Sequence, residues 1–481
     1  MKEFFKKHDL FKILGICMVV AALLTWILRY AVFQGTELMT FDEEVKGLPG
    51  IFDTSTIGLF DFHTYPLLVL YYFTNIFIFI FVVFAFYKIL GKTKKYERLV
   101  SNVGKMFEGK ELVFIILSMV FYSVLASIVN DYFILLAFIP FTISILNRLK
   151  VDKISSLITT FGSTMVGVLA ATYSNRIVGT LISTANFNMT YANELLAHII
   201  LAVVSLAALV LLILPRLNNK KLDEVKDLFV EEQKPAKKKY INVIPLAFFM
   251  IIFAVIILLA FMPWSTWQVT FFEDLYKSIT EATIFGYTIP AVVLGQTTFV
   301  AFGEWDLFTI SAFMMLTIIV YKFVANISID EIIEGTGEGL KLALKPLALV
   351  AMIYTVLVFS VSFPVIPQII VGIGKLFSAE FLRPINWFLS GLVTSTFVAD
   401  FQYFVTLTGT YFAGLNPTEV VAIALKASYA FAGFIAPTSI MLMLGLSTLD
   451  IKYSEYFKFI WKFLIALLAI TLVVLYILLY I

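Results

Sequence analysis

Residues 103–107 read VGKMF and residues 373–377 read IGKLF, and each motif leads through apolar residues to an isolated carboxylate. The carboxylate is Asp131 in the first stretch, 27 residues after the glycine of the motif, and Asp400 in the second, 26 residues after it. Each stretch then ends in a short polar break, at 172–176 and at 436–439. A duplicated apolar segment with two polar interruptions in each copy is typical of secondary transporters that are built from repeats.

The composition of the whole chain is that of a membrane protein. Of its 481 residues, 60% are hydrophobic and only 14% are charged, whereas soluble domains average about 25% charged residues. Many apolar runs approach the roughly 20 residues that cross a bilayer as a helix. None of them alternates as the strands of a membrane β-barrel do. The sequence therefore predicts an all-α polytopic membrane protein in contact with the lipid bilayer.

Composition also argues against several other classes of function. The net charge of +2 gives no indication of nucleic acid binding, and the single cysteine, Cys17, rules out a disulfide within the chain. The three histidines are scattered along the sequence and do not favour a histidine metal site. Residues 91–93 resemble the end of a phosphate-binding loop, but Phe86 stands where that motif needs glycine. We therefore expect no cofactor and no ATP-driven pump.

Lysine and arginine in the short loops predict the orientation of the chain. We expect a multi-pass plasma membrane protein with its N-terminus in the cytoplasm, the loop 34–64 outside and the C-terminus outside. The predicted parts are a first transmembrane repeat at 1–215, a basic cytoplasmic linker at 216–241, an extra helix with an outer loop at 242–304, and a second repeat at 305–481. The extra helix gives the two repeats opposite orientations, as in inverted-repeat transporters.

Each repeat is predicted to hold a helical hairpin of the re-entrant type and a broken transmembrane helix. The hairpins are expected at 112–146 and 386–413, and the broken helices at 155–185 and 418–446. The other predicted helices are 10–33, 65–87, a surface helix within 88–110, 197–214, 242–263, 306–325, a surface helix that starts at Ser328, 343–361 and 459–480. Ser328 is a candidate N-cap because acidic residues follow it in the first turn.

The polar breaks supply the candidate site. A carboxylate at depth in a membrane costs about 2.5–3.5 kcal/mol on insertion scales, so it is retained where a partner or a water-filled site compensates it. Broken helices offer such compensation through their free backbone groups. The predicted substrate-binding residues are Asn130, Asp131, Ser174, Asn175, Arg176, Asp400, Gln402, Thr438 and Ser439. Asp131 and Asp400 are also candidate sodium ligands. The alternative is that the serine, threonine and asparagine residues only hold helices together.

Arg176 carries a permanent charge in the middle of an apolar run, too far from either end for its side chain to reach the membrane surface. It must therefore meet an anion, which is Asp131, Asp400 or a substrate carboxylate. The guanidinium is a planar fork that binds a carboxylate through two hydrogen bonds, which lysine cannot reproduce. We interpret Arg176 as the ligand of a substrate carboxylate instead of a member of a fixed salt bridge.

The chain resembles the C4-dicarboxylate anaerobic carrier family, with its DcuC-like and YfcC-like members, in the ion transporter superfamily. The matching residues are Thr25 and Trp26, 329–335, 436–439 and 456–462. The resemblance implies a plasma-membrane secondary carrier, two inverted repeats with paired hairpins, and a homodimer. Members often carry a Gly-Glu-Glu type motif at the first hairpin tip. This chain has Asn130 and Asp131 there, with one acid in place of two.

We therefore predict a secondary transporter, not an enzyme, that moves a small carboxylate-bearing metabolite or amino acid by alternating access. It would be driven by a sodium or proton gradient or would work by exchange. Three alternatives stay open. The first is a basic amino acid antiporter of the arginine/ornithine type. The second is a membrane-embedded enzyme that acts on lipid, and the third is an assembly factor, which would not need matched carboxylates within the membrane.

Overall fold

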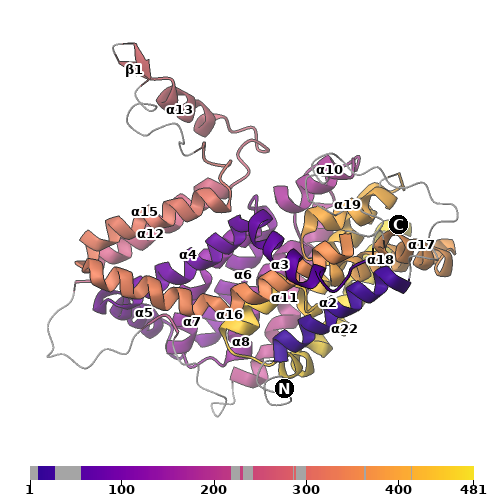
Figure 1. Ribbon diagram of the computed structural model, residues 1–481, viewed down its shortest axis with the longest axis horizontal. Helices are drawn as coiled ribbons and strands as arrows, with labels where there is room; N and C mark the ends of the chain where they lie inside the picture. Colours follow the sequence, from indigo (N-terminus) through magenta and orange to yellow (C-terminus); the bar gives the residue numbers. More distant parts are fainter. Residues whose placement is uncertain are drawn as a thin grey trace.

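The computed structural model describes residues 9–27, 56–217, 228–230, 242–284, 286–288, 300–361, 365–412 and 414–480. These residues are almost all helical, and the strands among them are the two-residue pair β1 (Thr283–Ile284) and β2 (Tyr287–Thr288). Figure 1 shows an elongated helical body from which this hairpin and α13 (Phe271–Thr280) project. The prediction of an all-α polytopic membrane protein is confirmed, since nine helices of the described part are long and apolar enough to cross a membrane.

The helices that could cross a membrane belong to all parts of the chain. They are α2 (Asp9–Ile27), α4 (Thr74–Gly91), α6 (Glu111–Ile128), α11 (Leu195–Leu217), α12 (Ile244–Phe261), α15 (Leu307–Ala325), α16 (Ile329–Val361), the pair α20 (Thr418–Ile435) and α21 (Ile440–Thr448), and α22 (Tyr453–Tyr480). A helix satisfies its backbone hydrogen bonds within itself, which is the condition for crossing a lipid interior.

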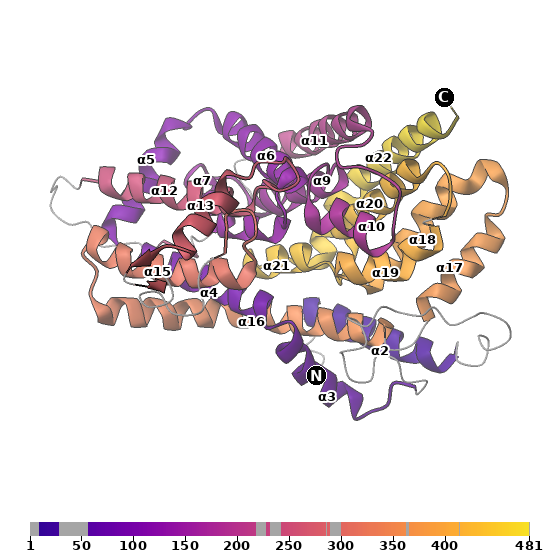
Figure 2. The ribbon, with the colours of Figure 1, turned by 90° about the horizontal axis from the view of Figure 1, so that it is seen from above.

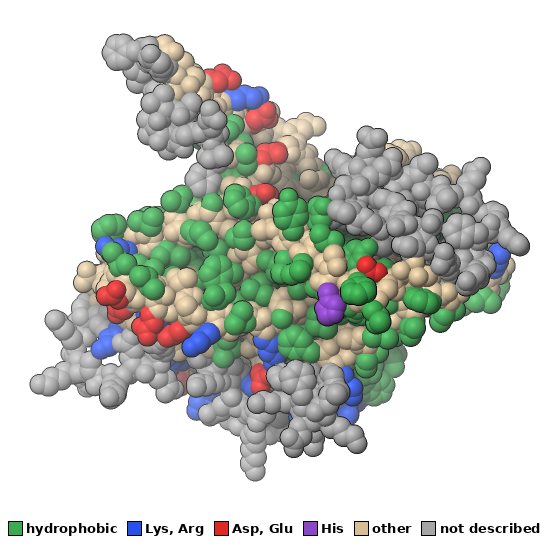
Figure 3. All heavy atoms as spheres, in the orientation of Figure 1, with side chains coloured by type: hydrophobic (Ala, Val, Ile, Leu, Met, Phe, Trp, Pro, Cys, Tyr) green, Lys and Arg blue, Asp and Glu red, His purple; other side chains and the backbone are tan. Residues whose placement is uncertain are grey.

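The surface of the body is apolar over a broad band. On α12, Phe248 and Ile251 are more than 60% exposed, whereas Phe253 and Ile257 on the opposite face are buried. In Figure 3 hydrophobic side chains cover much of the visible face, and charged side chains lie mainly along its lower edge and on the α13 projection. Such a large apolar surface is unfavourable in water and suits contact with lipid.

The 33-residue helix α16 runs along one long edge of the body (Figure 2). Its start is a capping box: the amide of Glu331 donates to the Ser328 hydroxyl at 3.1 Å, and the Ser328 amide donates to the Glu331 carboxylate at 2.8 Å. This confirms Ser328 as the N-cap. The expectation of a surface helix separate from 343–361 was wrong. The helix continues because Gly335 and Gly339 allow it to pack directly against α4, next to Ile89 and Ala85.

This close approach of α16 and α4 can be tested with two glycines of the same helix. A Cβ atom at Gly339 would lie 2.4 Å from the Cα of Ala85, whereas one at Gly337 would meet nothing within 4 Å. We expect Gly339→Ala to lower the free energy of unfolding by about 1–3 kcal/mol through overpacking. Gly337→Ala, the matched control, should raise it by up to ~1 kcal/mol through better helix propensity. Thermal melting of both variants in detergent measures this, and equal melting temperatures would contradict the packing described.

Two other segments differ from the prediction. The run expected as one helix at 65–87 is divided at Phe73 into α3 (Asp61–Tyr72) and α4. The proline- and glycine-rich stretch after α16 contains the helix α17 (Val365–Leu376) and the short turn η6 (Glu380–Leu382). The predicted surface helix after α4 is present as α5 (Lys94–Met106), with buried Leu99 and Val100 on its inner face.

Both helical hairpins and both broken helices occur where they are predicted. The first hairpin consists of α6, η3 (Tyr132–Ala137) and α7 (Ile139–Arg148), and the second of α18 (Arg383–Phe397) and α19 (Phe401–Phe412). The first broken helix consists of α8 (Lys153–Leu157), η4 (Ile158–Gly162) and α9 (Ser163–Leu169), then η5 (Asn175–Gly179) and α10 (Thr180–Thr184). The second is α20 and α21.

Each hairpin is tied to the broken helix of its own half by the same kind of contact. The Ser127 carbonyl accepts from the amide of Thr172 at 3.0 Å, and the Thr172 hydroxyl lies 3.0 Å from that of Ser127. In the second half the Thr438 hydroxyl donates to the Thr396 carbonyl at 2.7 Å. Ser127 and Thr396 each lie four residues before the aspartate of their hairpin. This correspondence favours a duplication, while the opposite orientation of the copies stays a prediction.

Residues 28–55 and most of the basic linker, on which the predicted orientation rests, lie outside the described part of the chain. Orientation can be measured with single cysteines in a Cys17→Ala background. We expect Leu59→Cys, on a residue that is 86% exposed, to react with an impermeant maleimide added outside intact cells. Arg98→Cys on α5 should react only after permeabilisation, because the predicted orientation places this helix on the cytoplasmic side. Labelling of Arg98→Cys from outside would contradict the predicted inverted repeat.

Candidate functional site

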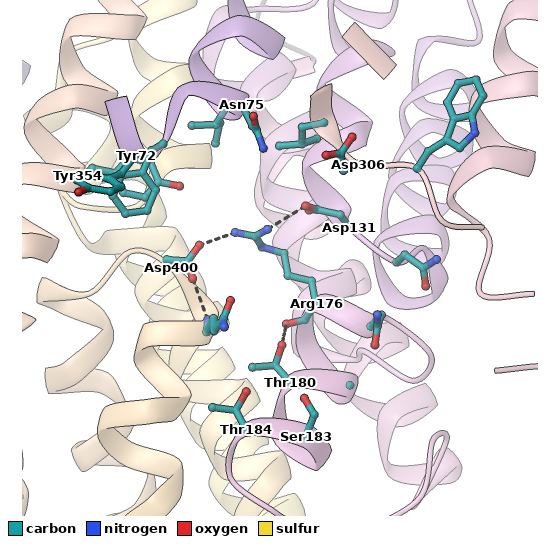
Figure 4. Close-up of a pocket in the computed structure, with 18 residues that line it drawn as sticks. Tyr72, Asn75, Asp131, Arg176, Thr180, Ser183, Thr184, Asp306, Tyr354 and Asp400 are labelled. Carbon is teal, nitrogen blue, oxygen red and sulfur yellow. Dashed lines mark hydrogen bonds and ion pairs between the residues drawn. The ribbon is translucent and has the colours of Figure 1, made fainter. Parts of the chain in front are cut away.

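A cavity of about 520 Å³ lies where the two hairpin tips meet the first broken helix (Figure 4). Its wall includes six of the nine residues that the sequence predicts for the site: Asn130, Asp131, Asn175, Arg176, Asp400 and Gln402. The structure therefore brings together residues from the two halves of the chain, such as Asp131 and Asp400, which are 269 positions apart in the sequence. Its volume falls in the range of roughly 300–1,000 Å³ that is usual for small-molecule sites.

Arg176 lies between the two carboxylates and pairs with both. Its Nη1 donates to Asp131 Oδ2 at 2.9 Å and its Nη2 to Asp400 Oδ2 at 2.5 Å. The second oxygen of each carboxylate accepts a hydrogen bond from the backbone of its own hairpin. Asp131 Oδ1 accepts from the amide of Phe133, and Asp400 Oδ1 accepts from the amide of Gln402, both at 2.9 Å. Each aspartate therefore caps the second arm of its hairpin and presents its remaining oxygen to Arg176.

The guanidinium keeps unused binding capacity. Arginine has five N–H donors, and the two ion pairs use one on each terminal nitrogen. Within the described part of the chain, the buried Nε has no hydrogen-bond partner. The group lies over the ring of Phe133, 4.8 Å from its centroid, which adds a cation–π contact. Arg176 can thus accept a further anionic group at the cavity surface.

The cluster as a whole carries an excess of negative charge. Arg176 contributes one positive charge against the two carboxylates with which it pairs, which leaves a net charge of −1. The side chains are 10–23% exposed, so the charges are only partly screened by solvent. A third acid, Asp306, lines the cavity as the exposed N-cap of α15. An anionic ligand would therefore add to a negative charge that the cluster already carries.

Backbone contacts hold Arg176 in this position. The tip of the first hairpin binds the break in the first broken helix, because the Arg176 amide donates to the Asn130 carbonyl at 2.8 Å. The Asn130 amide donates to the Phe261 carbonyl at 2.8 Å, and its side chain donates to the Gly303 carbonyl at 2.6 Å. Asn130 thus joins the hairpin tip to the end of α12 and to the loop before α15. Its contacts are those of a positioning residue.

Three residues predicted for the site do not line this cavity. Ser174 is fully buried, and its hydroxyl has no hydrogen-bond partner among the described residues. Thr438 is buried and donates to Thr396. Ser439 caps α21 by accepting from the amide of Leu442 at 3.3 Å. The first break therefore contributes Asn175 and Arg176 to the cavity wall, whereas no residue of the second break at 436–439 lines it.

Other cavity residues were not predicted from the sequence. Thr180, Ser183 and Thr184 line one side, with Thr180 bonded to the Arg176 carbonyl at 2.8 Å, and Asn75 and Tyr354 lie on the other side (Figure 4). The three hydroxyl residues recur at the three- and four-residue spacing of one helix face, which is a signal that the sequence did contain. The contribution of Tyr354 from α16 has no such signal, because it depends on tertiary packing.

No group of three or more His, Cys, Asp or Glu side chains in the described residues is arranged to hold a metal ion. Sodium binding by Asp131 and Asp400 therefore stays a prediction. Comparison with models of known protein families finds a match. The sequence model of a family described as the C4-dicarboxylate anaerobic carrier matches residues 8–480, which is nearly the whole chain. The curated proteins give no match.

Proposed function

The chain belongs to the C4-dicarboxylate anaerobic carrier family, and on this premise we propose that it carries a C4-dicarboxylate through the cavity around Arg176. As a member of that family it is a multi-pass membrane transporter. The observation that supports the finer proposal is the position of Arg176, whose guanidinium lies at a cavity between the two hairpin tips and has a second N–H on each terminal nitrogen that the ion pairs do not use. Arginine is the side chain best suited to planar recognition of a carboxylate.

The rest of the cavity can accommodate the second carboxylate. Ser183, Thr184 and Asn75 supply neutral hydrogen-bond donors along its wall. They add no further positive charge, however, so that a dianion would enter a cluster of net charge −1. We therefore propose that a proton or a sodium ion enters with the substrate and offsets the added negative charge. Transport would then be coupled to the movement of that cation, and the excess of acid in the site supports this proposal.

The ion pairs also suggest how the cavity changes its access. Arg176 and Asp131 belong to the first half of the chain, whereas Asp400 belongs to the second. A substrate carboxylate that takes the place of Asp400 on Arg176 would remove a charged link between the halves. We propose that this exchange of partners lets the two hairpins separate on one side of the membrane, as alternating access requires.

Counterflow in liposomes tests the proposed function. Liposomes that contain the purified carrier and unlabelled succinate should accumulate radiolabelled succinate well above the level of empty liposomes. Excess fumarate or malate should abolish the uptake.

A second candidate substrate rests on the three acids of the cavity, Asp131, Asp400 and Asp306, which would suit a ligand with an amino group. The same assay with labelled arginine, ornithine and aspartate separates the candidates. Counterflow of arginine or ornithine without succinate would overturn the dicarboxylate proposal and favour a basic amino acid antiporter.

A further inference from the structure

A second pair of titratable groups lies inside the protein, away from the cavity. Lys426 on α20 is 1% exposed and His198 on α11 is 2% exposed. The Lys426 amine lies 2.5 Å from His198 Nε2 and donates to the carbonyl of Ala171 at 2.9 Å. The other ring nitrogen, His198 Nδ1, is 2.8 Å from the carbonyl of Glu194. The pair joins a helix of the second half to the break of the first broken helix.

Counting donors shows which protonation state these contacts satisfy. A carbonyl oxygen only accepts, so Nδ1 of His198 must carry the proton and donate to Glu194. The neutral imidazole then presents a lone pair on Nε2, and Lys426 must donate to it. A neutral amine has two N–H groups, which the Ala171 carbonyl and His198 Nε2 satisfy completely. An ammonium has a third N–H, which finds no acceptor in the described part of the chain.

The surroundings provide no counter-charge that pairs with Lys426. The elements packed against α20 are α9, α18, α19, α21 and α22, and those packed against α11 are α6, α9 and α22. The other charged or titratable groups on these elements and on α11 and α20 themselves are Glu111, Tyr122, Arg216, Arg383, Tyr403, Tyr411, Glu419, Tyr429, Tyr453, Glu455, Tyr456, Lys458, Lys462, Tyr476 and Tyr480. None of them shares a hydrogen bond or an ion pair with Lys426 or His198 in the described contacts. An ammonium here would be a buried and incompletely paired cation, which is costly.

The pair is also connected to the proposed substrate site. Ala171 directly precedes Thr172, whose amide is bound to the Ser127 carbonyl at the first hairpin. Arg176 follows five residues after Ala171 and is held by Asn130 of the same hairpin. A change in the bond between Lys426 and the Ala171 carbonyl therefore acts on the segment that positions Arg176. Lys426 is at the same time part of α20, which belongs to the second half of the chain.

We propose that Lys426 and His198 form a proton-binding site that couples the movement of protons to the movement of substrate. This inference rests on the proposed function and names its coupling ion. The Lys426 amine takes up one proton and becomes an ammonium when the pair is accessible from one side of the membrane. It releases that proton when the pair is accessible from the other side. Over one transport cycle the protonation of the pair returns to its starting state, and one proton has crossed the membrane with the substrate.

The test separates exchange from accumulation. Counterflow of succinate needs no gradient, whereas accumulation driven by a pH difference across the liposome membrane needs the coupling site. We expect Lys426→Met and His198→Gln to keep succinate counterflow within about threefold of wild type. Both should lose pH-driven accumulation at least tenfold. Lys458→Met, which removes an exposed lysine of α22, is the matched control and should behave as wild type.

Protons can also be counted directly, without a gradient across a membrane. Calorimetric titration with succinate in buffers of different ionisation enthalpy should show that about one proton is bound or released, and that this number falls towards zero in His198→Gln. This measurement decides the question if Lys426→Met does not fold, as judged by gel filtration. If succinate shows no counterflow at all, the proposed function is overturned. The proton coupling of the Lys426–His198 pair is then measured with the amino acid that does exchange in the same assay.

Two results would overturn the inference. One is pH-driven accumulation by Lys426→Met and His198→Gln that equals that of wild type, which would make the pair structural. The other is wild-type accumulation that follows a sodium gradient and ignores a pH gradient.

Discussion

Replacement of Arg176 by lysine is expected to weaken succinate binding about tenfold or more, which corresponds to ~1.4 kcal/mol. The guanidinium holds Asp131 and Asp400 on two different nitrogens, at 2.9 Å and 2.5 Å, and still has N–H groups for a ligand. The single ammonium nitrogen of lysine cannot bind an aspartate and a substrate carboxylate side by side in one plane, as the guanidinium can. Succinate titrations of the two purified proteins in detergent would measure the difference.

The control for this prediction is Arg383→Lys, since Arg383 begins α18 and its side chain is 47% exposed. That variant should bind succinate as wild type does. The amount of folded Arg176→Lys protein should be little changed, because one ion pair can still form. If Arg176→Lys instead lowers the amount of folded protein, and an added Asp131→Asn restores it, the pairing is structural and the substrate role of Arg176 is contradicted.

Asp131→Asn and Asp400→Asn are each expected to reduce gradient-driven transport at least tenfold while the protein still inserts and folds. Folding should survive because the asparagine oxygen can still accept from the amide of Phe133 or Gln402 and so retain the cap. Removing one negative charge changes the cluster from a net charge of −1 to zero, so that the site no longer attracts a companion cation. It also removes an insertion cost of about 2.5–3.5 kcal/mol.

We expect the dependence on the driving ion to change in at least one of these two variants. Asp450→Asn is the matched control, because Asp450 pairs with Lys345 at 3.0 Å and its side chain is 83% exposed. Uptake into liposomes under a sodium gradient or a pH gradient, compared among the three variants, gives the measurement. Normal transport by both Asp131→Asn and Asp400→Asn would show that the paired carboxylates only stabilise the fold.

The sequence predicts much of this architecture because the membrane restricts the choice of structure. Apolar runs must become helices, and isolated charges must find partners, so that the hairpins, the broken helices and the importance of Asp131, Asp400 and Arg176 follow from the chain alone. Residues 329–361 show the limit of this reasoning. Their change from polar to apolar suggested two helices, but the close packing of Gly335 and Gly339 on α4 keeps one helix intact.

The partners within the site could not be predicted, because they depend on how the two halves meet. Arg176 could have met Asp131, Asp400 or only a substrate, and the structure shows that it pairs with both aspartates. Lys426 is a different case. A single lysine in the apolar run of α20 is itself a signal of function. Its partner His198 lies 228 residues away, and only the tertiary structure brings the two together.

The most direct test of the substrate site is an electron cryomicroscopy structure of the wild-type carrier with succinate. The account predicts density for succinate in the cavity of Figure 4, with one carboxylate within hydrogen-bonding distance of the Arg176 guanidinium and with Asp400 or Asp131 displaced from it. Succinate bound elsewhere, with Arg176 still paired to both aspartates, would contradict the account.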